Sequence, residues 1–388
     1  MRTGQARAYG PLRNGDVSYI GDSVCHVCPS RHAPREANME SAIPRHLTCP
    51  RSRERRIGDD FVPPFPAWVA RADASVKDVV MGYFGVQSKG HAALAKARAA
   101  LQHIVRGFSL VDGPGRHDLA QYVDEAGYDN LIAIAYWDNQ PGFARWQASP
   151  AIDWWWSDEA RLGDGLGYFR EILSPGTERF ETLFSTADRK EGVGALMGGT
   201  SAEIQEHGYW GSMRDRLPIA QTDSIEPAGA LSVRDLAPAL GRRTQINGHQ
   251  NLAVIRSGQE WTETEGKERD LYLGEMEPIL HAGMDFLRDE GQSIGCYANR
   301  YMRHVDSSGQ LLEKSFGLSY WRSLADMERW SESHPTHLAI FGTFMRIVQE
   351  LNFQLKLRLY HEVTVLESGQ QDFEYVNCHP KTGLMRGV

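Results

Sequence analysis

The chain has 388 residues, with 42 lysine and arginine residues against 50 aspartate and glutamate residues, and its formal net charge is −8. An acidic chain without a basic stripe is not typical of a nucleic-acid-binding protein, and its apolar runs fall short of the about 20 residues that a membrane span needs. Its five cysteines are too few for a disulfide scaffold in a chain of this length. We therefore expect a globular protein of the reduced cytoplasm, with neither nucleic acid nor membrane as a partner.

Residues 1–38 lack hydrophobic periodicity and contain no apolar segment typical of a secretion signal. They are predicted to form an irregular, disordered leader. Cys25 and Cys28 form a C-x-x-C pair within it, but no second pair follows at the spacing of a zinc ribbon. We interpret this pair as incidental.

From residue 78 onward, strands and helices are predicted in alternation. The first series has strands over 79–86, 117–123 and 128–137, and helices over 91–105 and 142–148. The second series has strands over 251–257, 292–303 and 315–321, and a long helix within 264–288. The strand over 128–137 is apolar on both faces, so we expect it to be buried.

Two of these segments resemble each other. The residues Tyr136-Trp137, Arg145-Trp146 and Ser149 recur at a constant offset as Tyr320-Trp321, Arg329-Trp330 and Ser333. Such a recurrence indicates duplication of one strand–helix unit. We therefore predict an α+β fold in which duplicated ferredoxin-like modules form a dimeric α/β-barrel-like fold, with halves over 39–230 and 231–388.

A strand with near-perfect alternation is predicted close to the C-terminus. One of its faces carries Leu355, Leu357, Leu359, His361, Val363 and Val365. His361 is the one titratable side chain on this apolar face. Because an unpaired buried imidazole is costly, it needs a hydrogen-bond partner or a function. The pattern leaves two interpretations open: a core histidine bonded to a carbonyl oxygen, and a histidine with a chemical role.

A second histidine lies on a predicted helix that begins near Ser333 and Pro335, with Ser333 as the N-cap residue. An apolar stripe follows on this helix, formed by His337, Ile340, Phe341, Phe344 and Val348. A neutral imidazole at the end of such a stripe suits axial ligation of a haem iron, and it equally suits an ordinary buried helix. His334, one turn earlier, is a competing ligand on spacing alone.

Other polar residues carry weaker signals. Ser257 ends an apolar strand, where serine usually caps a turn, and no G-x-S-x-G elbow surrounds it. Arg214 and Arg216 are interpreted as ion-paired surface residues. Glu181 lies inside the apolar run 180–184, which indicates partial burial. Neither a P-loop nor a strand-linked G-x-G-x-x-G is present, so nucleotide cofactors have no support.

Long strings of residues carry more information than these single positions. They include Phe65-Pro-Ala-Trp68, Arg161-Leu-Gly-Asp-Gly-Leu-Gly-Tyr-Phe-Arg170, Glu206-His-Gly-Tyr-Trp-Gly-Ser-Met-Arg-Asp-Arg216, Ile255-Arg-Ser-Gly258, Glu332-Ser-His-Pro-Thr-His-Leu338 and Leu359-Tyr-His-Glu362. Together these strings resemble the haem-containing aldoxime dehydratases, the lyases that form nitriles. The similarity extends from about residue 39 to the C-terminus.

The resemblance implies a homodimer that holds a non-covalent b-type haem in one half of a duplicated ferredoxin-like fold. It also implies that the ferrous haem binds an aldoxime through nitrogen, and that loss of water gives the nitrile. Matched motif by motif, His337 falls on the axial ligand of the iron and His361 on the distal general acid and base. Ser257 falls on the oxygen-binding serine, Arg216 on the assisting arginine and Glu181 on a supporting distal acid.

Three other functions compete with the lyase. One is a haem peroxidase or chlorite-dismutase-like enzyme, for which peroxide-dependent oxidation without nitrile formation would be the evidence. Another is a haem carrier or sensor without turnover. The third is a cofactor-free dimeric barrel with both histidines in its core, which the residues alone would favour. The resemblance makes the lyase the leading hypothesis.

Overall fold

The structure, a computed structural model, describes residues 39–237 and 243–388. The predicted leader, with Cys25 and Cys28, lies outside the described residues. Within the described ranges, no helix combines the length and the apolar character needed to cross a membrane.

The first series of predicted elements is confirmed, with bounds shifted by a few residues. It consists of β2 (Val80–Lys89), α1 (His91–Gly107), β3 (Arg116–Val123), β4 (Tyr128–Trp137), α2 (Gln140–Gln147), α3 (Pro150–Ser157), α4 (Ala160–Gly163) and β5 (Gly167–Leu173). Asn139 caps α2, since its side chain accepts a hydrogen bond from the amide of Gly142. Residues 130–137 of β4 are buried, as their apolar character on both faces predicts.

The second series repeats this order. It consists of β10 (Leu252–Glu260), α6 (Gly266–Leu271), the π-helical turn η5 (Tyr272–Met276), α7 (Glu277–Asp289), β11 (Cys296–Val305), β12 (Leu311–Trp321), α8 (Leu324–Ser333), α9 (Pro335–Glu350) and β13 (Arg358–Leu366). The long helix predicted within 264–288 is therefore one run interrupted by η5. The predicted strand over 292–303 begins only at Cys296, because residues 291–294 form a short 3-10 helix.

One prediction about α9 is wrong in detail. Ser333 is the last residue of α8, and the N-cap of α9 is His334, whose side chain accepts a hydrogen bond from the amide of Thr336. Pro335 then occupies the first helical position, where its missing N–H costs nothing. The helix that carries His337 nevertheless begins where the sequence predicts.

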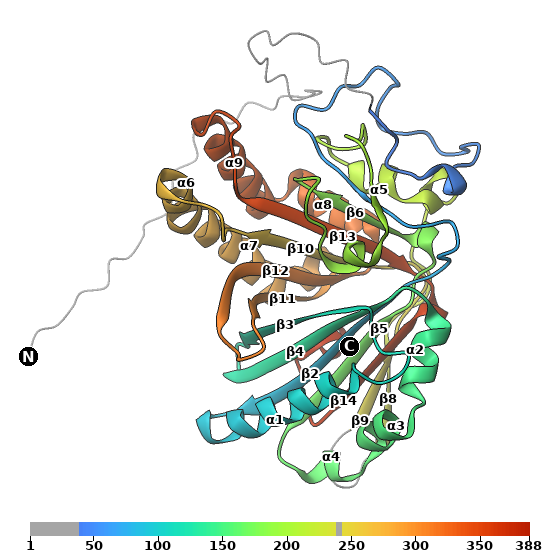
Figure 1. Ribbon diagram of the computed structural model, residues 1–388, viewed down its shortest axis with the longest axis vertical. Coiled ribbons are helices and arrows are strands. Elements are labelled where there is room, and N and C mark those ends of the chain that lie inside the picture. Colours follow the sequence, from blue (N-terminus) through green and yellow to red (C-terminus); the bar gives the residue numbers. More distant parts are fainter. Residues whose placement is uncertain (1–38, 238–242) are drawn as a thin grey trace, which may run out of the picture. The chain divides into compact units, whose positions relative to one another are not determined.

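The strands form a 12-stranded antiparallel sheet, so the fold is α+β, as predicted. Its order is β6-β13-β10-β12-β11-β3-β4-β2-β5-β14-β9-β8. The added strands are β6 (Phe180–Phe184), β8 (Ser232–Ala237), β9 (Arg243–Asn247) and β14 (Gln371–Val376), and a separate pair is formed by β1 (Ala70–Arg71) and β7 (Gly199–Thr200). Figure 1 shows α1 to α3 beside one half of the sheet and α6 to α9 beside the other.

The chain exchanges strands between the two halves of the sheet. Strand β6 follows the first series but pairs with β13 of the second. Strand β14 follows the second series but pairs with β5 of the first. The halves also meet at β3 and β11, which pair only through residues 119–121 and 303–305. The first exchange is the one that matters for the site, because it brings residue 181 to the strand of residue 361.

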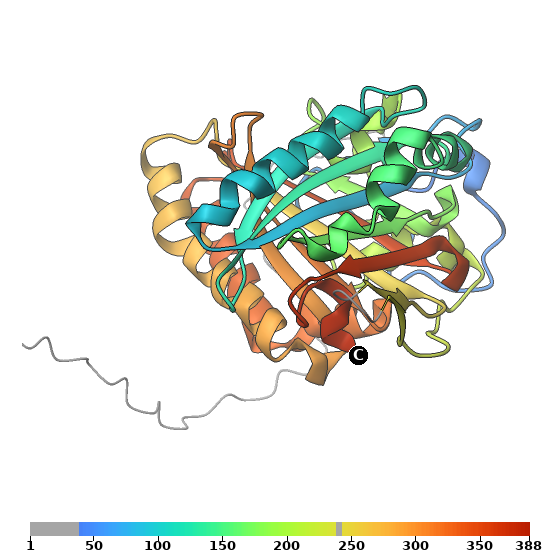
Figure 2. The same ribbon diagram turned by 90° about the horizontal axis from the view of Figure 1, so that it is seen from below.

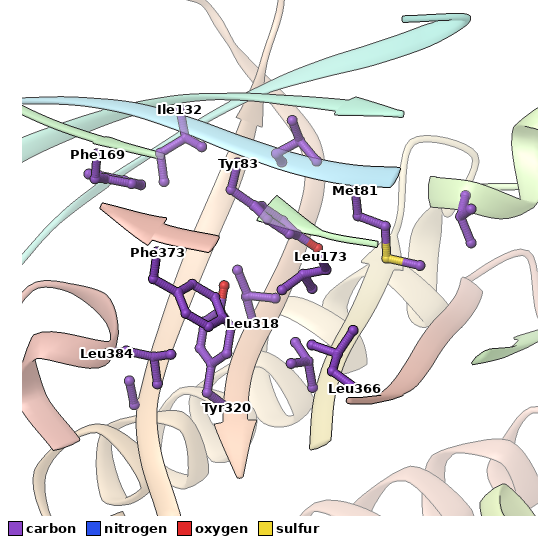
Figure 3. Packing of buried hydrophobic residues seen from close by; sticks show 14 of the residues in the cluster. Met81, Tyr83, Ile132, Phe169, Leu173, Leu318, Tyr320, Leu366, Phe373 and Leu384 are labelled. Atoms are coloured by element: carbon purple, nitrogen blue, oxygen red, sulfur yellow. The ribbon is translucent and has the colours of Figure 1, made fainter. Parts of the chain in front are cut away.

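The two faces of the sheet have different roles. One face forms a core shared by both series, to which Met81, Tyr83, Phe169, Leu318 and Tyr320 belong, as Figure 3 shows. The other face is covered by helices: α1 lies along β2 and β4 in Figure 2, and α7 packs on β11. Alternation along the strands sends neighbouring residues to opposite faces. Any side chain on the second face of β10 or β13 therefore points toward α7, α8 and α9.

Candidate active site

Three of the predicted site residues meet in one hydrogen-bonded cluster. The Arg216 guanidinium donates through Nε and Nη2 to the Glu181 carboxylate, at 2.8 and 3.0 Å. The Nε2 atom of His361 lies 3.0 Å from Glu181 Oε1 and 2.8 Å from Arg216 Nη2. Glu181 and Arg216 are 5% and 2% exposed. The interpretation of Arg216 as a surface residue is therefore wrong, although its ion pair is present.

Three separate elements bring the cluster together. Glu181 lies on β6 opposite Val363 of β13, and His361 lies two residues away on the same face. Arg216 ends the short helix α5 (Ser212–Arg216), and its Nη1 also donates to the carbonyl oxygen of Glu206 at 2.8 Å. This third bond holds the guanidinium in place, so that Arg216 contacts the carboxylate and the imidazole at the same time.

The cluster keeps Glu181 ionised. Burial alone would raise the pKa of this carboxyl group, but the Arg216 guanidinium and the His361 ring overcome it and lower the pKa to about 2. The imidazole has a partner in either state at Nε2: a protonated Nε2 donates to Glu181, and an unprotonated one accepts from Arg216. This arrangement suits a group that gives and takes protons.

Ser257 lies beside this cluster, on the neighbouring strand. Its direct cross-strand partner on β13 is His361, so the two side chains share the helix-covered face. The adjacent residues Arg256 and Glu362 form the next cross-strand pair of β10 and β13. Both are buried on the opposite face of the sheet. Burial raises the pKa of Glu362, whose carboxylate accepts hydrogen bonds from the hydroxyl of Tyr136 and the amide of Val193. This second network lies on the core side of the sheet, directly behind the pair of Ser257 and His361.

His337 lies outside the hydrogen-bonded cluster, in the first turn of α9. Its ring packs edge-on against Trp330 and Trp210, with centroids 4.7 and 5.7 Å away. Burial lowers the pKa of His337 to about 4, against a small opposing effect of the Ser331 carbonyl, so the imidazole is neutral near pH 7. Its Nδ1 atom is buried without a hydrogen-bond partner among the described residues.

The competing candidate His334 is engaged elsewhere. Its Nδ1 atom lies 2.9 Å from the hydroxyl of Thr336, and its ring stacks on Phe286 at 4.3 Å. In the described ranges, no group of three or more histidine, cysteine, aspartate or glutamate residues could hold a metal ion by itself. A single neutral imidazole is consistent instead with a metal that brings its other ligands along, as haem iron does.

The helix α9 leaves part of its apolar surface exposed. It packs on α7, α8 and η5, and of its residues only Ile347 and Val348 are buried. Leu338 and Phe341, near His337, are 41% and 37% exposed. An apolar helix face of this kind needs a cover. A neutral imidazole next to an uncovered apolar face fits the predicted haem site.

The same two apolar clusters border both histidines. Along β13, Leu359 packs in one cluster with Ile340 and Phe344 of α9. Val363 packs in the other with Trp330 of α8. His361 lies between Leu359 and Val363 on that face, and His337 lies in sequence between Trp330 and Ile340. His361 therefore lies where the two clusters meet along β13, and the chain segment that carries His337 runs from one cluster to the other.

The segment before Arg216 contains residues that the sequence interpretation did not assign. Trp210 contacts both His337 and Phe341. His207 is buried, and neither of its ring nitrogens has a partner among the described residues. Burial and the nearby Arg216 lower the pKa of His207 to about 3. Both residues lie within the string from 206 to 216. The length of this string was the feature of the sequence that could have pointed to them as site residues.

The family of haem-containing dehydratases matches residues 82–384. The chain belongs to this family. The match confirms the predicted family, its haem cofactor and its class as a lyase.

Individual relatives cover nearly the whole length described above. The aliphatic aldoxime dehydratase of Pseudomonas chlororaphis is 54% identical over 348 residues, which are 90% of this chain and 98% of that protein. The phenylacetaldoxime dehydratase of Bacillus sp. (strain OxB-1) is 33% identical over 335 residues, or 85% and 94% of the two chains. A crystal structure of an aldoxime dehydratase in complex with butyraldoxime is 51% identical, with a TM-score of 0.87 over 92% of this chain and 99% of that one.

Proposed function

We propose that this haem-containing dehydratase converts aliphatic aldoximes, R–CH=N–OH, to nitriles and water. Sequence relatives named aliphatic aldoxime dehydratases are 52–54% identical to it, whereas the phenylacetaldoxime dehydratase is 33% identical. The observation that carries the proposal is the buried cluster of Glu181, Arg216 and His361 beside Ser257. Dehydration needs such a proton donor and acceptor next to groups that bind a hydroxyl.

We propose that His337 would hold the haem iron through its imidazole. Its neutral imidazole lies in an aromatic setting at the start of the incompletely covered helix α9. The apolar side chains of α9 would pack against the porphyrin. When bound in the ferrous state, haem would supply an electron-rich iron that can polarise the N–O bond of the oxime.

The residues of the chain act on the oxime hydroxyl. Ser257 and Arg216 hold the hydroxyl oxygen, and their donors stabilise the charge that develops on it. His361 gives a proton to this oxygen from Nδ1, since its Nε2 faces Glu181 and Arg216. The charge of Glu181 stabilises the imidazolium before the transfer, as a carboxylate partner of histidine does. His361 then takes the proton from the carbon atom, which completes the loss of water without net redox change.

One experiment tests the proposal directly. The purified protein would be reduced under anaerobic conditions, followed by its absorption spectrum, and mixed with butyraldoxime. We expect a histidine-ligated haem spectrum, a spectral change with the oxime in the ferrous state, and butyronitrile as the product. Haem without nitrile from any aldoxime would contradict the proposal and favour the peroxidase or the carrier. Absence of haem after reconstitution would contradict the role of His337.

The duplication of the fold, the oligomeric state, the haem type and the cellular location are part of the same proposal. We infer that the two series are duplicated ferredoxin-like modules, because each shows the order β-α-β-β-α-β and the same sequence of pairings, β5-β2-β4-β3 and β13-β10-β12-β11. We also keep a homodimer, a b-type haem, the boundary near residue 230 and a cytoplasmic location as predictions. Sedimentation velocity of the haem-loaded protein tests the dimer.

A further inference from the structure

The proposed function leaves open what limits the size of the aldoxime. The floor of the site is a row of directly paired residues that crosses five strands on one face. In order, the row is Leu183 on β6, His361 on β13, Ser257 on β10, Gly317 on β12 and Tyr301 on β11. Paired residues of neighbouring strands lie about 5 Å apart, so the row is a continuous surface.

Gly317 is the one position in this row without a side chain. Leu183 fills the side of the row toward β6, and Leu359 and Val363 fill the positions before and after His361 on β13. An alkyl chain that extends along this row from an oxime held by Ser257 and His361 therefore reaches Gly317 next. The row beyond it is closed by Tyr301, whose hydroxyl hydrogen-bonds Ser315 at 2.8 Å.

Met284 of α7 lies on this glycine. A Cβ atom added to Gly317 would come 2.8 Å from the Met284 sulfur, which is closer than real Cβ contacts, so the thioether occupies the place of the missing side chain. Asn299 of β11 positions this residue, because its Nδ2 donates to the Met284 carbonyl oxygen at 2.8 Å and lies 3.8 Å from the sulfur. Met284 thus covers the row at Gly317.

The Met284 side chain has space behind it. A partly open cavity of about 290 Å³ lies between α7, β11 and the end of β3. Met284, Asn299 and Tyr301 line it together with charged side chains that include Asp285, Arg288 and Arg303. Methionine is unbranched and flexible, and it adapts to neighbours of different shape. The Met284 side chain can therefore withdraw from Gly317 into this cavity.

We infer that Met284, seated on Gly317 beside Ser257, is the residue that limits the length of the alkyl chain of the aldoxime. This inference rests on the proposed function, since it concerns the substrate of the same site. Short chains end against the thioether. Longer chains require the thioether to move from Gly317 toward this cavity, and the end of the chain then takes the place of the sulfur above the glycine.

The test compares Met284→Ala with the wild-type holoenzyme on unbranched aldoximes from butyraldoxime to decanal oxime. We expect the variant to gain kcat/KM on the long oximes relative to butyraldoxime, by about three- to fivefold for each methylene group that becomes covered. Dissociation constants from spectral titration of the reduced protein should shift in the same direction. The double variant Met284→Ala, Gly317→Val should restore the limit on chain length, because the valine side chain refills the space that the Met284 thioether leaves above residue 317.

Met302→Ala is the matched control. Met302 lies on β11, next to Tyr301, but it is fully buried in the core on the opposite face. This variant should lose stability without a change in chain-length preference. If Met284→Ala kept the chain-length preference of the wild type, the inference would be overturned. Nitrile formation by the wild-type protein would still support the proposed function in that case. Absence of nitrile from every oxime with the wild-type protein would instead overturn the proposed function.

Discussion

Replacement of Glu181 by glutamine removes one charge from the most deeply buried part of the site. The carboxylate accepts two hydrogen bonds from Arg216 and lies 3.0 Å from the imidazole of His361. A pKa lowered from 4.5 to about 2 means that the folded protein favours the charged form by about 3 kcal/mol. Loss of one partner from a buried ion pair costs about 3–5 kcal/mol, which agrees with this value. We expect Glu181→Gln to lower the free energy of unfolding by about 3 kcal/mol at pH 7.

The pH dependence of this loss gives the reasoning its sharpest test. Because the folded pKa of Glu181 lies below its unfolded value, the stabilisation is present above about pH 5 and is lost as the pH falls from about 4.5 to about 2. The difference between wild type and Glu181→Gln should therefore shrink to about 1.5 kcal/mol at pH 3. Urea denaturation of both proteins at pH 7 and pH 3, at equal haem content, measures this difference.

A second ion pair provides the control. Glu328 is buried and accepts from Nε and Nη2 of Arg214, at 3.2 and 2.8 Å, two residues before Arg216. Glu328→Gln should also reduce stability, but it should leave kcat unchanged. Glu181→Gln should lower kcat at least about tenfold, because His361 loses the charge that stabilises its protonated form. Equal kcat values in Glu181→Gln and Glu328→Gln would refute the reasoning. A stability difference between wild type and Glu181→Gln that does not change with pH would refute it as well.

Three further outcomes are expected. His337→Ala should keep its secondary structure but purify without haem, which the Soret band and far-UV circular dichroism measure; retention of haem would remove His337 as the ligand. His361→Ala should retain haem and lose about 10²- to 10⁴-fold in kcat, as expected for removal of a general acid and base, and near-normal nitrile formation would contradict its role. Gly192→Ala should lower the free energy of unfolding by about 1–3 kcal/mol, because Gly192 has φ of 58° and its added Cβ would collide with the Glu362 carboxylate. Gly198→Ala, with no neighbour within 4 Å of the added atom, should be neutral by the same denaturation assay.

Local patterns in the sequence determined the secondary-structure elements that carry the two histidines of the site. The alternation along residues 355–365 predicted that His361 lies on the same face as Leu359 and Val363, and the strand β13 confirms this arrangement. The strand begins only at Arg358, however, and its other face, with Glu362 and Thr364, is buried as well, because the shared core of the sheet covers it. The apolar stripe and Pro335 predicted the helix that carries His337. These predictions succeed because hydrophobic periodicity and the missing N–H of proline act within a few residues of the chain.

Tertiary structure alone decided how the site is assembled. The interpretation of Arg216 as a surface residue failed because no local pattern reveals a partner that lies 35 positions earlier in the sequence. Burial of Arg216 depends on β6, which crosses from the first series to pair with β13 of the second and so places Glu181 beside His361. The thioether of Met284 on Gly317 has the same origin, since the fold of the sheet brings α7 against β12. Contacts of this kind close long loops, and their positions follow from the packing of the whole sheet rather than from the spacing of residues along the chain.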